Sequence, residues 1–265
     1  MRTGISTGCL YPMLTKDSLE ALSGQGFRLF EIFFNTFSEL EPDYTDKLKR
    51  ILERGGAEIC SIHPFTSSYE SFLLFSAYEK RFEDGLRFYE MYFRTARRMD
   101  CRYVIIHGLS DLFSYISHRE YFRRFLLLAE LANKFGVTLL QENVYRHIGN
   151  SPELFEEMYS CSSGAGWGFV LDTKQAVRGG CDPCDFLRAG RDRIRHIHIS
   201  DHDKEGNCVL PGRGIYDFDK FFSCLKEINY TGDVIIEVYN SSYGETEELG
   251  AAAGFLRKYT ESGRN

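Results

Sequence analysis

The sequence predicts an α/β fold, a single (β/α)8 TIM barrel that uses residues 1–265 as one domain. Three observations predict it. Eight short runs rich in β-branched and aromatic residues alternate with longer segments whose apolar residues have helical spacing. Eight such units fill a length that is typical of this barrel. Polar side chains also stand near the end of most runs, where a barrel builds its active site.

The predicted strands follow one another with room for a helix after each. In chain order they are 3–7 (TGIST), 29–33 (LFEIF), 58–63 (EICSIH), 103–107 (YVIIH), 138–142 (TLLQE), 168–172 (GFVLD), 195–200 (RHIHIS) and 234–238 (VIIEV). Their apolar character indicates strands that are buried in a parallel sheet.

The clearest helices between these strands are predicted at 79–99, 119–135 and 218–228, where apolar residues recur every three or four positions. Glycine-containing stops at 24–26 and 133–136 precede the next strands. The alternative fold is a doubly wound open sheet, which normally carries a glycine-rich turn after an early strand. Here the first strand runs into GCLYP, which lacks the pattern that cradles a pyrophosphate.

Composition narrows the function. Apolar residues make up 43% of the chain, enough for a sizeable core without disulfides. The net charge of −6 argues against a nucleic-acid-binding protein. We find neither the apolar region of a signal peptide nor a run long enough to span a bilayer, so we expect a cytoplasmic protein without membrane contact.

The eight cysteines are scattered, and we expect them to be reduced thiols. Cys181 and Cys184 have the C-x-x-C spacing. A structural zinc site would need a second such pair nearby, so we interpret these two as incidental loop cysteines rather than a metal or redox site.

Seven polar residues lie near the ends of consecutive predicted strands. Polar side chains in such strands are costly unless they are paired or bound, and in a barrel these ends meet at one face. Together they predict a metal-centred active site built from Glu31, His63, His107, Glu142, Asp172, His198 and Glu237.

The chemistry of that site depends on the number of ions. A mixed carboxylate and imidazole set suits Mn, Mg, Co or Zn. His63 and His107 could hold a second ion or bind substrate oxygen. Two ions sharing Glu142 would indicate phosphodiester hydrolysis, whereas one ion with paired glutamates would indicate proton abstraction next to a carbonyl.

The segment IRHIHISDHD holds three of the seven histidines. Strand alternation places His196 and His198 on one face, with His198 nearer the carboxyl end. We therefore expect His198 to bind the metal and His196 to be a hydrogen-bonded core residue. Asp201 and His202 fall in the following loop, and we expect neither to act on substrate.

Other residues have weaker assignments. Arg213, in the glycine-rich loop LPGRG, could grip a hydroxyl, carboxylate or phosphate, or could be solvated. We expect Lys174 to be a surface lysine, and Glu31 to lie behind the ligands and orient His63. For the aromatic residues near the strand ends we expect core packing; these are Tyr11, Phe33, Phe34 and Phe65.

Nearly the whole chain resembles the sugar phosphate isomerase/epimerase family, whose xylose-isomerase-like barrel also occurs in ketose 3-epimerases and endonuclease IV. The resemblance is carried by the order of FEIFF, SIHPF, VIIHG, LLQENV, GFVLDTKQA, HIHISDHD, LPGRGIYDF and VIIEVY. It implies a small sugar substrate and one divalent metal, and it allows a homo-oligomer. The ligands it implies are Glu142, Asp172, His198 and Glu237.

By this resemblance Glu142 and Glu237 are also the acid and base, on opposite faces of the substrate. One removes a proton next to a carbonyl, and the metal stabilises the resulting enediolate. Proton return to the other carbon gives isomerisation, and return to the same carbon from the other face gives epimerisation. With a leaving group β to the carbonyl, the alternative outcome is that of a lyase or dehydratase.

Two departures from the family pattern matter. Epimerases and endonuclease IV carry a histidine three residues after the aspartate, where this chain has Gln175, which can bond a sugar hydroxyl but is a poor ligand. The D-x-H pair that completes the third zinc site of endonuclease IV is replaced by CVLPGRG. An endonuclease IV-like phosphodiesterase acting on abasic DNA is therefore the less favoured alternative, also because duplex binding relies on basic residues.

Overall fold

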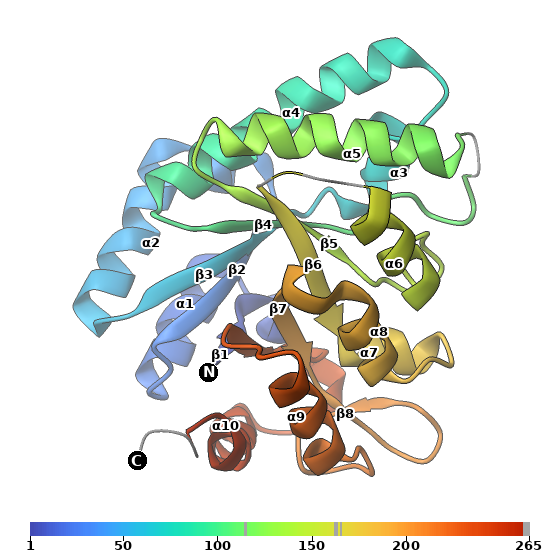
Figure 1. The fold of residues 1–265 in the computed structure, drawn as a ribbon. Helices are drawn as coiled ribbons and strands as arrows, with labels where there is room; N and C mark the ends of the chain where they lie inside the picture. Colours follow the sequence, from blue (N-terminus) through green and yellow to red (C-terminus); the bar gives the residue numbers. More distant parts are fainter. Residues whose placement is uncertain (114–115, 162–163, 165, 262–265) are drawn as a thin grey trace.

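The computed structural model describes residues 1–113, 116–161, 164 and 166–261. At its centre eight parallel strands close into a barrel in the order β1-β10-β7-β6-β5-β4-β3-β2 (Figure 1). The predicted (β/α)8 barrel is confirmed. The barrel strands are β1 (Arg2–Ser6), β2 (Leu29–Phe33), β3 (Glu58–His63), β4 (Tyr103–Ile106), β5 (Thr138–Glu142), β6 (Trp167–Asp172), β7 (Ile194–Ile199) and β10 (Asp233–Ile236).

The strand ends differ slightly from those expected from the sequence. β4 ends at Ile106 and β10 at Ile236, so His107 and Glu237 are the first residues after their strands. All six residues of β6 are buried, as expected for a strand covered on one face by helices and on the other by the barrel interior. The polar residues predicted at strand ends therefore reach the same carboxyl-terminal face.

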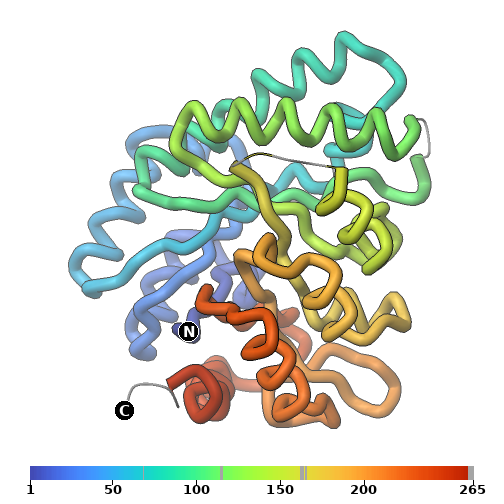
Figure 2. The backbone as a smooth tube through the Cα atoms, viewed as in Figure 1, coloured from blue at the N-terminus to red at the C-terminus, as the bar shows by residue number. Residues whose placement is uncertain are grey.

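Helices surround the barrel and cover its outer face (Figures 1 and 2). The described ones are α1 (Thr15–Gly24), α2 (Pro42–Gly55), α3 (Glu70–Leu73), α4 (Glu79–Arg98), α5 (His118–Asn133), α6 (Pro152–Cys161), α7 (Thr173–Arg178), α8 (Pro183–Gly190), α9 (Phe218–Glu227) and α10 (Glu247–Thr260). Within the described ranges, no helix combines the length and apolar character that crossing a membrane would require.

The helix boundaries follow local sequence signals. Ser117 begins α5 by accepting a hydrogen bond from the backbone N–H of Glu120, and Asp182 begins α8 in the same way from Cys184. Helix α2 ends at Gly56, whose φ of 60° lies in the left-handed region that glycine adopts at low cost. The expected stop at 24–26 also ends α1.

Within the part of the chain that the structure describes, three clusters of buried apolar residues support the barrel, one large and two of three residues each. The large one lies between the strands and the helices, and includes Phe30, Trp167 and Phe169. A small group in the barrel interior consists of Ile105, Leu140 and Val170.

The chain leaves β7 through a longer connection before α9, seen as the orange loop at the lower right of Figure 2. It contains the small antiparallel pair β8 (Asp201–His202) and β9 (Cys208–Val209). Asp201 organises this connection, since its carboxylate accepts hydrogen bonds from the backbone N–H groups of Gly212, Gly214 and Tyr216. Asp201 is buried and bonded to backbone groups, which agrees with the expectation that it does not act on substrate.

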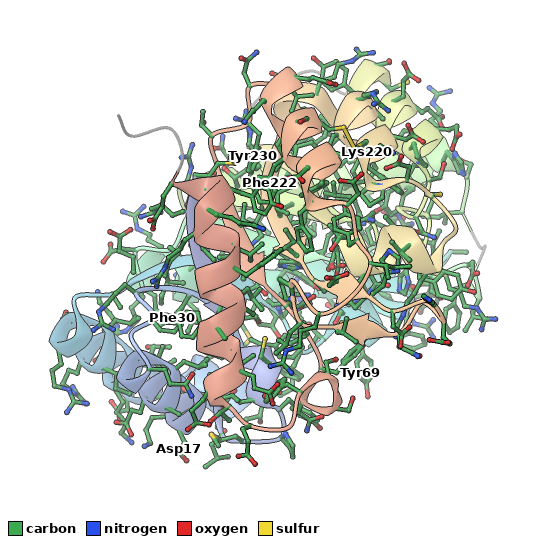
Figure 3. All side chains as sticks on the ribbon, turned by 90° about the horizontal axis from the view of Figure 1, so that it is seen from below. Asp17, Phe30, Tyr69, Lys220, Phe222 and Tyr230 are labelled. Carbon is green, nitrogen blue, oxygen red and sulfur yellow. A yellow bond between two sulfur atoms is a disulfide. The ribbon has the colours of Figure 1, made fainter. Side chains whose placement is uncertain are left out.

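The expectation of eight reduced cysteines is wrong for two of them. Cys184 in α8 and Cys224 in α9 form a disulfide, with Cα atoms 5.9 Å apart and a separation of 40 positions in sequence. Figure 3 shows it as a yellow bond near Lys220. Cys181 is a free thiol, so the C-x-x-C spacing does not form a redox pair. Helix packing, rather than spacing in sequence, selects the partner of Cys184.

Candidate active site

Four polar residues meet at the carboxyl-terminal end of the barrel. Glu142 and Asp172 are the last residues of β5 and β6, His198 is in β7, and Glu237 directly follows β10. The register of β6 and β7 sets Asp172 beside His198. Each of the four residues offers a ligand atom, and these atoms all lie within 4.8 Å of one another. Strands far apart in sequence thus assemble the set that the sequence predicted.

His198 is held from both sides of its ring. Its Nε2 atom lies 2.9 Å from Oε2 of Glu31, and its Nδ1 atom lies 3.3 Å from Oε1 of Glu142 and 3.5 Å from Oε2 of Glu237. Burial alone would lower the pKa of His198, but the charges of Glu31, Glu237 and Glu142 raise it well above its ordinary value. The imidazole is therefore fixed in place by carboxylates.

Glu31 lies below His198 and is fully buried. Its Oε2 atom accepts a hydrogen bond from Ser61 at 2.8 Å and lies 3.4 Å from Nε2 of His196. The expectation that Glu31 orients His63 is wrong, because its hydrogen bonds go to His198 and Ser61. A register shift between Phe30 and Glu31 occurs where this side chain enters the barrel.

His196 is buried one layer deeper than His198, as expected from strand alternation. Its Nε2 atom lies 3.2 Å from the hydroxyl of Ser61. Burial lowers the pKa of His196, so the neutral imidazole is favoured. With Glu31 and His198 it forms a further group of potential ligand atoms within 4.8 Å, enclosed beneath the first set.

His63 and His107 form a pair beside Glu142. Their Nε2 atoms lie 3.1 Å apart, and Oε2 of Glu142 lies 3.5 Å from the first and 3.3 Å from the second. Phe33 stacks on the ring of His63 with 4.7 Å between ring centroids. Glu142 thus belongs to two groups of potential ligands at once.

The two histidines of this pair have opposite pKa shifts. Burial would lower the pKa of His63, but Glu142 raises it to about 9. Burial also lowers the pKa of His107, and there the effect of Glu142 does not compensate. This agrees with their contact, since two Nε2 atoms can share a hydrogen bond only when one is protonated and the other is not.

Two carboxylate oxygens of the set have no hydrogen bond to any described residue. They are Oε2 of Glu142 and Oδ2 of Asp172, both buried. Buried carboxylate oxygens need a compensating positive charge, which Lys174 supplies to Oδ2 of Asp172 at 3.0 Å and which a bound divalent ion would supply to both oxygens. Mixed carboxylate and imidazole donors suit a divalent ion of the Mn, Co, Zn or Mg type. The residues present therefore fit such an ion.

Lys174 is buried at the site and contacts two of its carboxylates. The expectation of a surface lysine is wrong: its exposed fraction is 7%, and Nζ lies 3.0 Å from Oδ2 of Asp172 and 2.9 Å from Oε2 of Glu237. Asp172 accepts a hydrogen bond from the backbone N–H of Gln175 and so starts α7 at the strand end. Lys174 lies in that first turn, which brings its long side chain back over the set.

The charges of this group are strongly linked. Burial raises the pKa of Asp172 to about 7, although Lys174 opposes the shift. Burial would also raise the pKa of Glu237, but Lys174 and His198 lower it below its ordinary value. Lys174 itself would have its pKa lowered by burial, yet Asp172 and Glu237 raise it well above the ordinary value. The ammonium is thus the counter-charge of these carboxylates.

A cavity of about 520 Å³ opens above this group, and Lys174 and Glu237 form part of its wall. The remaining wall is mainly aromatic. The lining side chains include Tyr11, Phe33, Phe65 and Tyr239, together with Asn35. A small polar ligand with an apolar face would find both ionised groups and ring surfaces here.

The aromatic residues near the strand ends therefore fall into two groups, one packed in the core and one lining the cavity. Phe34 is fully buried, as expected for core packing. Tyr11, with 59% of its surface exposed, does not pack in the core, and this expectation is wrong for it. Phe33 and Phe65 are partly buried and face the cavity.

Gln175 and Arg213, which were expected to contact substrate, are bonded to protein groups in this structure. Oε1 of Gln175 accepts a hydrogen bond from the backbone N–H of Tyr145 at 3.1 Å. Arg213, whose side chain is 57% exposed, forms an ion pair of 2.5 Å with Glu248 of α10. The structure thus places Arg213 on the outer side of its loop.

Glu70 is a buried acid that the sequence analysis did not single out. Its Oε2 atom accepts a hydrogen bond from the backbone N–H of Gly108 at 2.6 Å, and Tyr89 donates to its Oε1 at 2.5 Å. Burial raises the pKa of Glu70 to about 8. The signal in the sequence was a single acid within the apolar segment SYESFLLF. It supports the turn that carries His107.

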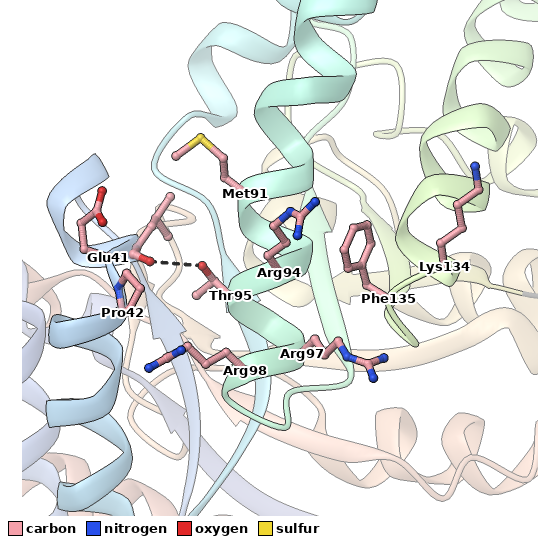
Figure 4. A pocket seen from close by; sticks show the side chains of 10 residues that line it. Glu41, Pro42, Met91, Arg94, Thr95, Arg97, Arg98, Lys134 and Phe135 are labelled. Atoms are coloured by element: carbon pink, nitrogen blue, oxygen red, sulfur yellow. Dashed lines mark hydrogen bonds between the residues drawn. The ribbon is translucent and has the colours of Figure 1, made fainter.

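A different hollow lies on the outer surface, between α4 and the segment that leads into α2 (Figure 4). Its lining is basic and apolar, and Thr95 donates a hydrogen bond to the backbone oxygen of Leu40 across it. The cations are Arg94, Arg97, Arg98 and Lys134. Its only carboxylate is that of Glu41, so it lacks the paired acids and imidazoles found at the strand ends.

The chain was compared with known proteins. A model of the xylose isomerase-like TIM barrel matches residues 19–259. An inosose dehydratase of Clostridium beijerinckii is 26% identical over 136 residues, which cover 42% of this chain and 46% of that protein. The chain therefore spans less than half the length of this curated relative.

Two solved structures show the same fold. A D-tagatose 3-epimerase-like protein superposes with a TM-score of 0.82 at 21% identity, covering 99% of this chain and 98% of the other. The IOLI protein with a binding zinc atom superposes with a TM-score of 0.79 at 20% identity, covering 99% of both chains. At this identity the likeness establishes the fold alone.

Proposed function

This chain belongs to the xylose isomerase-like TIM barrel family, and from that premise we propose that it is a divalent-metal-dependent sugar isomerase or epimerase. One observation carries the proposal. Glu142 and Glu237 reach a single buried group of potential ligands from different strands, and the cavity above that group has aromatic walls. Two carboxylates at one centre are what proton transfer to and from carbon requires.

The metal ligands in this proposal are Glu142, Asp172, His198 and Glu237. Their fit to a divalent ion rests on the buried oxygens without hydrogen bonds, on Glu142 and Asp172. When bound there, an ion such as Mn, Co, Zn or Mg supplies Lewis acidity that polarises a substrate carbonyl. The IOLI structure contains a zinc atom, which supports this assignment by fold. A second ion at His63 and His107 remains part of the proposal.

Glu142 and Glu237 exchange the proton in this mechanism. One of them removes a proton from the carbon next to the carbonyl, and the other delivers a proton on the opposite face. In the metal-free protein Lys174 and His198 lower the pKa of Glu237, so this carboxylate is ionised at neutral pH before an ion binds. Return to the neighbouring carbon gives an isomer, and return to the same carbon gives an epimer.

His63 and His107 are the proposed contacts to substrate oxygens. Their Nε2 atoms lie 3.1 Å from each other, so a substrate oxygen has to replace this contact to be held by either ring. Contact of Gln175 or Arg213 with the substrate, also part of the proposal, requires them to leave Tyr145 and Glu248. The stacked ring of Phe33 keeps His63 in its orientation.

A dehydratase or lyase is the second candidate function. It is favoured by the similarity to an inosose dehydratase. The same proton abstraction, on a substrate with a hydroxyl β to the carbonyl, ends in loss of water instead of proton return. The substrate decides between these outcomes.

An NMR screen in D2O tests the proposal. The purified protein is supplied in turn with Mn, Co, Zn and Mg and offered ketoses, keto-sugars and inososes. We expect deuterium to enter one substrate carbon, and Glu142→Gln or Glu237→Gln to slow this about 100-fold or more. Glu245→Gln, an exposed substitution outside the site, is the control. A folded protein that exchanges no proton with any metal and substrate of the panel would refute the proposal, and loss of water would identify the dehydratase.

A further inference from the structure

Lys174 lies within the group of residues that we propose as metal ligands. Its Nζ atom donates a hydrogen bond to Oε2 of Glu237 at 2.9 Å and forms an ion pair of 3.0 Å with Oδ2 of Asp172. Only 7% of the residue is exposed. The ammonium is therefore fixed between two carboxylates and is shielded from water.

A divalent ion would need the same two carboxylates. An ion held by Asp172 and Glu237 would take carboxylate oxygens that the ammonium now contacts. The ammonium now contacts Oδ2 of Asp172, which accepts no hydrogen bond from any described residue. A metal ion and this ammonium would repel each other at such short range in a buried site.

The charges of the proposed metal ligands also indicate that Lys174 and a divalent ion compete for the same carboxylates. Glu142, Asp172 and Glu237 supply three negative charges when ionised, and Lys174 supplies one positive charge. The lysine charge therefore offsets part of the negative charge that a divalent cation would bind. Without the lysine charge, the same ligands would attract a divalent cation more strongly.

We propose that Lys174 acts as a tethered cation that occupies part of the ligand group in the metal-free protein and leaves Asp172 and Glu237 when a divalent ion binds. This rests on the proposed function only in taking these residues as metal ligands. In this proposal Lys174 lowers the affinity of the site for a divalent ion by competing for its ligands.

The structure also offers a place for the displaced ammonium. Nζ of Lys174 lies 5.0 Å from the centre of the Tyr239 ring, and both residues line the cavity of about 520 Å³. An ammonium over an aromatic face is stabilised by the electrons of the ring. The long side chain can therefore turn from the carboxylates to Tyr239 and stay in the cavity, where it would meet substrate oxygens.

Calorimetry with Zn²⁺ on chelator-treated protein tests this inference. We expect Lys174→Met to lower the Kd for Zn²⁺ at least tenfold, and Lys174→Arg, which keeps the charge, to leave it unchanged or raise it. Lys220→Met, which removes an exposed lysine paired with Asp182, should leave the Kd unchanged. Lys174→Gln replaces Lys174→Met if the latter does not fold, as judged by circular dichroism.

A second readout is the melting temperature. Metal-free Lys174→Met should melt below the wild type, because Asp172 and Glu237 then repel each other, and Zn²⁺ should raise its melting temperature by more than it raises that of the wild type. Zinc binding by the wild type with an equal or higher Kd in the neutral variants would overturn the displacement alone. Lack of binding by the wild type and all variants would overturn both this inference and the proposed metal centre.

Discussion

Oε2 of Glu31 lies 2.9 Å from Nε2 of His198, and both side chains are fully buried. The carboxylate fixes the ring, so that Nδ1 faces Glu142 and Glu237. Carboxylates that hold a ligating histidine in this way orient it and increase its basicity.

Glu31→Gln should therefore weaken metal binding while preserving the fold. The amide keeps the shape of the side chain but removes the charge that holds His198. We expect the Kd for Zn²⁺ to rise by about 10–100-fold, measured by calorimetry. Glu39→Gln, at a buried acid outside the site, is the matched control. An unchanged Kd in a folded Glu31→Gln protein would show that Glu31 has no influence on the ligand.

Addition of a divalent ion should stabilise the protein. An ion that binds only the folded state at 100 times its Kd adds about 2.7 kcal/mol to the free energy of unfolding. For a chain of this size that corresponds to a rise of several degrees in melting temperature. Scanning calorimetry with Mn²⁺ or Zn²⁺ checks this, and chelator should reverse it. The rise should be lost in His198→Ala; an equal rise in that variant would place the ion elsewhere.

Glu70 should make stability fall with rising pH. Burial raises its pKa from the ordinary 4.5 to about 8 in the folded protein. Between these values the folded state binds more protons than the unfolded state, so the free energy of unfolding decreases as pH rises from 4.5 to 8. Glu70→Gln removes this decrease, since the amide can still accept from Gly108 and donate to Tyr89.

The measurement is urea unfolding of both proteins at pH 5 and pH 8. Glu70→Gln should gain stability relative to the wild type between these two values. Glu83→Gln, at an exposed acid of α4, serves as control and should follow the wild type. Parallel pH profiles for the wild type and Glu70→Gln would mean that Glu70 is ionised throughout.

The disulfide between Cys184 and Cys224 should contribute to stability. It joins α8 to α9 across 40 residues and restricts the unfolded chain. Replacing both cysteines with serine should lower the free energy of unfolding by about 2–4 kcal/mol, measured in urea without reductant. Cys161→Ser, at an exposed free thiol, should have little effect. Addition of reductant should lower the free energy of unfolding of the wild type to that of the double variant.

The barrel was predictable because its signals are local. Short buried strands such as VIIEV and long amphipathic segments have periods that can be seen in the sequence itself. The convergence of Glu142, Asp172 and His198 follows from the fold, since parallel strands in a barrel all end at one face.

Other features of the site and the core depend on the direction of individual side chains and on helix packing, which hydrophobic periodicity does not predict. Lys174 was expected at the surface, yet α7 begins directly after Asp172 and its first turn brings the lysine side chain onto Asp172 and Glu237. The partner of Cys184 is set by the packing of α8 on α9. Glu31 was assigned to His63 of the neighbouring strand, whereas its side chain contacts His198 of β7.

The carboxylate of Asp172 has two tasks, one for each oxygen. Oδ1 caps α7 by accepting from the N–H of Gln175, whereas Oδ2 faces Lys174. The direction of the free oxygen is thus set by the helix, and so are the positions of the two side chains that follow. Exchange of residues 174 and 175 can therefore change the chemistry above the centre while the aspartate stays in place. The turn thus fixes the carboxylate through the helix and leaves the identity of the two following side chains to set what surrounds it.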